Sequence, residues 1–196
     1  MNQSQPSTVA TTTKWSLVLA SALLGSLPAA AVPDVCVLAP DITTSATAPP
    51  TATIPLSRPT LFIREPLVEM RLERDGALLW RASPPLATPL EGPRAWPLDP
   101  LQPNQRLTLR LRPLGADPGQ FATIRLQAAG RPRLEAGDTL LRSLLAGPPT
   151  AWRPTLEALL AKGDRPLATA LLFAREGPDE PSLNALRLEA ARTSCR

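Results

Sequence analysis

Strict alternation of apolar and polar residues marks two segments of the chain as β-strands. Val68, Met70 and Leu72 alternate with charged residues over positions 68–73. Leucines alternate with threonine and arginine in the same way over positions 107–112. Because the side chains of a strand point alternately to its two faces, this period of two predicts strands with one buried face.

Turn signals lie beside these two strands. The sequence Arg74-Asp75-Gly76 follows the first strand, and Asp-Gly tolerates the positive φ of a tight hairpin, so residues 77–81 are predicted to return alongside it. Residues 121–126 follow a Gly- and Pro-containing turn and are predicted to pair with the second strand. No helical pattern separates these strands, so residues 58–130 predict an antiparallel β-sandwich.

The period of the apolar residues becomes helical beyond this region. Trp152, Leu156, Leu159 and Leu160 follow the i, i+4, i+7, i+8 spacing of one helical face. The dipeptide Gly163-Asp164 combines a helix-ending glycine with a residue that caps the next helix. We therefore expect residues 134–194 to form helical hairpins packed on the sandwich, which makes the fold class α+β.

The first 31 residues have the order of a secretory signal peptide. Lys14 precedes an apolar run of 13 residues, Trp15 to Leu27, and small alanines follow at positions 29–31. The run is shorter than the roughly 20 residues that a membrane-spanning helix needs. We expect residues 1–31 to be removed and the rest to be exported to the periplasm or the extracellular space, with no integral membrane span. An uncleaved signal that anchors the protein is the alternative.

The two cysteines, Cys36 and Cys195, lie near the two ends of the exported chain. In an oxidising compartment a lone pair of cysteines is expected to form a disulfide. Residues 32–57 are rich in Pro, Thr and Ala and predict an extended lead-in, which Cys36 would fasten to the rest of the protein. Two unlinked thiols are the alternative interpretation.

Residue composition restricts the chemistry that this chain supports. It contains no His, which excludes Ser-His-Asp and Cys-His nucleophiles and His-ligated metals. Neither a glycine-rich phosphate loop nor clustered calcium ligands occur, so we expect no cofactor and no metal. We expect a non-catalytic protein, with a hydrolase that works through two carboxylates alone as the outside alternative.

Arginine is concentrated in the predicted sandwich, where residues 58–133 hold 12 Arg against 7 acidic residues. By their spacing Arg110, Arg112 and also Arg106 point to one face of a strand, and Arg125 of the next strand lies beside them. Guanidinium groups in this arrangement suit anions, such as an envelope glycan or a lipid headgroup. The alternative is that they pair with Glu69 and Glu73 across the sheet. Nucleic acid is not expected, because no aromatic residues interleave with the arginines.

One motif resembles the immunoglobulin-like and fibronectin-type domains. Leu101-Gln102-Pro103, followed by the alternating strand at 107–111, is similar to the stretch that enters their penultimate strand, although Leu107 stands where that family has Tyr. Some exported bacterial proteins of unknown function also place helices after such a sandwich. The resemblance implies an immunoglobulin-like sandwich. We expect an exported protein that mediates protein–protein or envelope interactions through a partner that the sequence does not identify.

Overall fold

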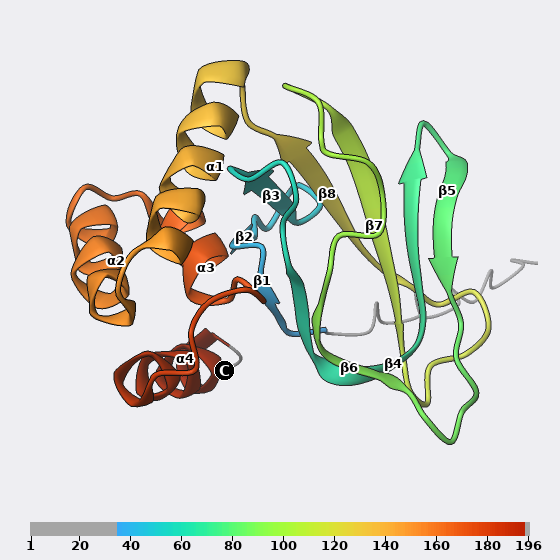
Figure 1. The fold of residues 1–196 in the computed structure, drawn as a ribbon. Coiled ribbons are helices and arrows are strands. Elements are labelled where there is room, and N and C mark those ends of the chain that lie inside the picture. The colour runs from blue at the N-terminus through green and yellow to red at the C-terminus, as the bar shows by residue number, and fades with distance from the viewer. Residues whose placement is uncertain (1–34, 195–196) are drawn as a thin grey trace, which may run out of the picture. The chain divides into compact units, whose positions relative to one another are not determined.

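A mixed β-sheet of eight strands forms the framework of residues 35–194, the part of the chain that the computed structural model describes (Figure 1). These residues all belong to one compact unit. The strands are β1 (Val37–Ala39), β2 (Ile42–Thr43), β3 (Thr51–Ile54), β4 (Leu61–Arg74), β5 (Ala77–Ala82), β6 (Leu90–Arg94), β7 (Arg106–Pro113) and β8 (Ala122–Ala128). Their order is β1-β4-β7-β8-β3-β2, and β5 and β6 also pair with β4.

The longest strand, β4, organises the sheet. It pairs with β1 and β6 near its start, and with β5 and β7 along its second half. Asp75 and Gly76 connect β4 to β5 with φ angles of 50° and 82°. Both angles are positive, as a two-residue hairpin turn of type I′ requires, so the hairpin predicted at Asp-Gly is confirmed.

The antiparallel immunoglobulin-like sandwich predicted for residues 58–130 is wrong. The strands form one mixed sheet, and β3 pairs in parallel with β8 while β7 pairs with β8 in the antiparallel sense. Strands β1 to β3 come from residues 32–57, for which the sequence predicts an extended lead-in. They are two to four residues long. β2 pairs with the nearby β3, but β1 pairs with β4 and β3 pairs with β8, which lie much later in the chain, so no local pattern indicates these two pairings.

Four α-helices follow the sheet in the chain: α1 (Arg131–Ala146), α2 (Trp152–Ala161), α3 (Arg165–Leu172) and α4 (Pro181–Ser194). The Asp164 side chain accepts a hydrogen bond from the backbone N–H of Leu167 at 3.2 Å and caps α3, as its position predicts. In α1, a Cβ on Gly137 would lie 2.3 Å from the carbonyl oxygen of Pro55. Only glycine therefore lets α1 approach the segment after β3 this closely.

Two hydrophobic clusters stabilise this arrangement. One lies on the inner face of the sheet and includes Leu72, Leu109 and the buried Trp96. The other lies among the helices around Trp152, which is 1% exposed, and Leu171. Among the described residues, the helices make their main contacts to the sheet at β1 and β3 (Figure 1). Arg106 of β7 and Arg125 and Gln127 of β8 are exposed.

The predicted signal segment, residues 1–31, and Cys195 lie outside the described residues. Among the helices of residues 35–194, none is both long enough and apolar enough to cross a membrane.

Candidate functional site

The polar face of the sheet carries most of the charged strand residues. We define it as the set of strand side chains that point away from the core. They are assigned from the strand register, since residues paired in register share a face. They are Thr51 and Thr53 of β3; Glu69, Arg71 and Glu73 of β4; Arg81 of β5; Arg106, Thr108, Arg110 and Arg112 of β7; and Thr123, Arg125 and Gln127 of β8. The three arginines predicted as an anion site, Arg110, Arg112 and Arg125, all lie on this face.

Glu69 is the centre of a charge network at the β4–β5–β7 end of the polar face. It is only 2% exposed, and three arginines from three strands bind its carboxylate. Its Oε1 lies 2.7 Å from Nε of Arg71 and 2.6 Å from Nε of Arg81, and its Oε2 lies 3.2 Å from Nη2 of Arg112. Because the carboxylate is buried, these contacts offset the cost of removing it from water.

A row of three arginines crosses the same part of the sheet. Arg110, Arg71 and Arg81 are neighbours in register on β7, β4 and β5, which would be unfavourable for like charges alone. Glu73 lies 3.7 Å from Arg110. The ring of Phe121 receives the guanidinium groups of Arg71 and Arg110 at 4.6 and 4.8 Å from its centroid. We call Glu69, Glu73, their four arginines and Phe121 the charge network.

Two opposing effects act on the pKa of Glu69. Burial raises the pKa of this carboxyl, whereas the hydrogen bond from Arg71 and the positive charges of Arg71, Arg81 and Arg112 lower it. The arginines prevail, so the pKa lies below its usual value of 4.5. Glu69 is therefore ionised near neutral pH and has no proton to donate as a general acid.

Arg110 and Arg112 are engaged with glutamates, as the alternative interpretation of the sequence described. Their Nε atoms are buried and have no hydrogen-bond partner within the described chain, so neither offers the Nε edge of its guanidinium to a ligand. Arg125, in contrast, is exposed. The structure thus places the three predicted residues on one face. Arg110 and Arg112 contact glutamates there, whereas Arg125 is exposed.

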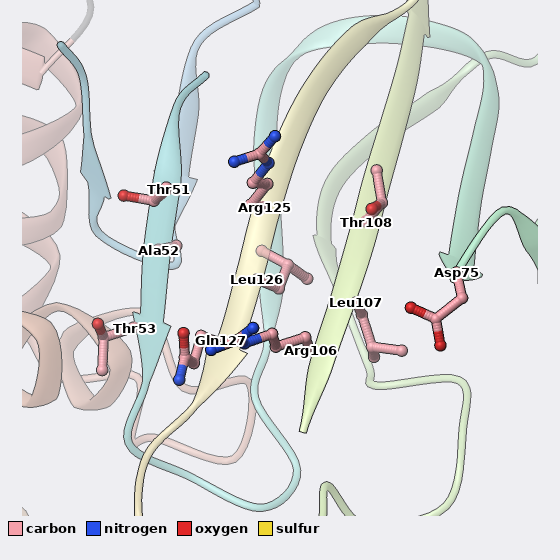
Figure 2. Close-up of a pocket in the computed structure, with 10 residues that line it drawn as sticks. All are labelled: Thr51, Ala52, Thr53, Asp75, Arg106, Leu107, Thr108, Arg125, Leu126 and Gln127. Carbon is pink, nitrogen blue, oxygen red and sulfur yellow. The ribbon is translucent and has the colours of Figure 1, made fainter. Parts of the chain in front are cut away.

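A pocket of about 460 Å³ lies at the other end of the polar face, over β3, β8 and β7 (Figure 2). Arg125 and Arg106 line it together with Thr51, Thr53, Thr108 and Gln127. The sequence grouped Arg106 with the arginines of β7 but missed the two threonines. The two threonines alternate with the buried Ala52 and Ile54, and this alternation is a sequence pattern that could have indicated a strand. It does not reveal that β3 lies next to β8.

A second pocket, of about 590 Å³, lies between β1, β2, α3 and α4, and Cys36 and Ser194 are among its lining residues. Its carboxylates are engaged: Asp41 lies 3.0 Å from Arg165, and Glu65 accepts a hydrogen bond of 2.7 Å from the backbone N–H of Cys36. Because Cys195 lies outside the described residues, its disulfide with Cys36 stays a prediction.

Within residues 35–194, no group of three or more Cys, Asp or Glu side chains is arranged to hold a metal ion. Searches of protein-family models, curated proteins and solved structures find no match to this chain.

Proposed function

We propose that this is an exported, non-catalytic binding protein that acts by contacting a protein or an envelope component through the polar face of its sheet. The observation that carries the proposal is that the pocket end of this face is exposed within the described residues. The helices pack against β1 and β3, and Arg106, Arg125 and Gln127 are exposed beside a pocket. The signal-peptide pattern of residues 1–31 supports export.

The state of the carboxylates on the polar face supports binding there rather than catalysis. Hydrolysis of a glycoside requires two facing acids, one of which carries a proton. Glu69 is ionised and held by three arginines, and Asp75 is the sole carboxylate among the residues that line the pocket on the polar face. Glu69 therefore has no proton to donate, and the pocket on the polar face has one acid where this chemistry needs two.

Photo-crosslinking tests whether the polar face is the interface. A photo-reactive residue such as benzoylphenylalanine replaces Gln127, which is exposed at the centre of the pocket side of the face. The matched control places it at Arg94, which is exposed on β6 and outside the pocket. We expect irradiation of intact cells to yield a specific adduct at position 127 that is absent at position 94.

Mass spectrometry of the same material, with and without reduction, tests export. We expect a chain cleaved near Ala31 whose mass rises by two hydrogens on reduction, because the predicted disulfide opens. Equal labelling at both positions, or an intact chain in the cytoplasm, would overturn the proposal.

A further inference from the structure

Six polar side chains form two parallel rows across the pocket on the polar face. The parallel pairing of β3 with β8 and the antiparallel pairing of β8 with β7 align them in register. The first row is Thr51, Arg125 and Thr108, and the second is Thr53, Gln127 and Arg106. Each row therefore combines one guanidinium with two neutral groups that donate or accept hydrogen bonds.

The two arginines of these rows have no acidic partner in the described chain. Within residues 35–194 no salt bridge joins Arg106 or Arg125 to a carboxylate, whereas all four arginines of the charge network have one. Asp75 lines the pocket and lies at its β7 side (Figure 2). The pocket thus has two positive charges against one negative charge, and both guanidinium groups remain available.

The positions of the two guanidinium groups suit a ligand that spans both rows. Arg106 and Arg125 are diagonal neighbours on adjacent strands, a relation that places their positions about 7–8 Å apart. Figure 2 shows the Arg106 side chain extending over β8 beside Gln127, with the Arg125 guanidinium one row away. Because arginine side chains are long and flexible, both guanidinium groups can turn toward a negatively charged group between the rows.

We infer that this pocket binds an anionic sugar, with Arg106 and Arg125 holding its carboxylate or phosphate and the threonines and Gln127 binding its hydroxyl groups. Guanidinium groups match carboxylate and phosphate oxygens with paired hydrogen bonds. The volume of about 460 Å³ lies within the roughly 300–1,000 Å³ of small-molecule sites. The inference rests on the proposed binding role of the polar face and names the chemistry of the ligand.

Calorimetric titration of the purified protein tests this inference. Glucuronate and glucose 1-phosphate serve as probes with a carboxylate and a phosphate, and neutral glucose serves as the uncharged control. We expect at least one of the two anions to bind at least tenfold more tightly than glucose, and the stronger of the two identifies the anionic group. The affinity should fall as salt rises, because mobile ions screen the exposed guanidinium groups.

Two variants and one matched control assign the site. Arg106→Gln and Arg125→Gln should each weaken binding at least tenfold, since each removes a charge-assisted contact. Arg94→Gln removes an exposed arginine of β6 outside the pocket and should leave the affinity unchanged. Circular dichroism of each variant serves as the control for folding.

Binding of neither anion, equal loss in Arg94→Gln, or equal affinity for inorganic sulfate would overturn the inference. These results are distinct from failure of the proposed function, because a crosslink at position 127 would still show that the polar face is an interface.

Discussion

The two ends of the polar face hold the same kind of residue in different states. In the charge network, each of the four arginines lies next to Glu69 or Glu73, and two of them also contact the ring of Phe121. In the pocket, Arg106 and Arg125 lie next to threonine and glutamine, and their guanidinium groups remain exposed. Cross-strand neighbours therefore decide whether an arginine on a sheet stabilises the fold or is available to a ligand.

The largest expected effect comes from removing the centre of the charge network. Glu69→Gln keeps the size of the side chain but leaves Arg71, Arg81 and Arg112 without their shared charge. We expect a loss of about 3 kcal/mol in the free energy of unfolding, the lower end of values for a broken buried pair, because Arg81 is half-exposed. Urea denaturation measures the loss. The exposed control Glu135→Gln should change stability by less than about 0.5 kcal/mol, and a similar loss in both would contradict this account.

Acid should weaken the same network. The pKa of Glu69 is lower in the folded chain than its usual 4.5, so its contribution to stability is complete above about pH 4.5. That contribution is lost as the pH falls through the lower, folded pKa. We expect the urea midpoint of the unmodified protein to fall more steeply between pH 5 and pH 2 than that of Glu69→Gln, and parallel curves would exclude this role for Glu69.

A smaller effect is expected from the aromatic ring of the charge network. Phe121→Leu keeps an apolar side chain but removes the ring that Arg71 and Arg110 contact. Because each cation–π contact at such sites contributes about 0.5–1 kcal/mol, we expect a loss of about 1 kcal/mol. Thermal unfolding measures it, and the loss should shrink when Arg110→Gln is already present. Full additivity of the two changes would mean that the ring and Arg110 do not interact.

The smallest effect is expected at the pocket. Arg106→Gln and Arg125→Gln should each change the free energy of unfolding by less than about 0.5 kcal/mol, because neither arginine has an acidic partner in the described chain. Arg112→Gln, in the charge network at the other end of the polar face, should destabilise the protein because it removes a partner of the buried Glu69. Chemical denaturation of the three variants compares them, and a loss at Arg125 equal to that at Arg112 would remove the distinction between the two regions.

Part of this site could be predicted from local sequence. The alternation at 107–112 identified β7 and placed Arg110 and Arg112 on one face. The alternation at 68–73 offered Glu69 and Glu73 as their alternative partners, and the structure pairs them. The threonines of β3 could not be predicted in the same way. That strand is four residues long and pairs in parallel with β8, about 70 positions later in the chain.

Local patterns by themselves determined the long strands, the Asp75-Gly76 turn and the cap at Asp164, because each depends on neighbours within a few residues. The tertiary structure alone decided that the strands form one mixed sheet and which arginines meet a carboxylate. Those outcomes depend on strand order and register, which bring together residues that are distant along the chain. The alternation of apolar and polar residues in a strand shows which side chains are buried but does not show which strand lies beside it.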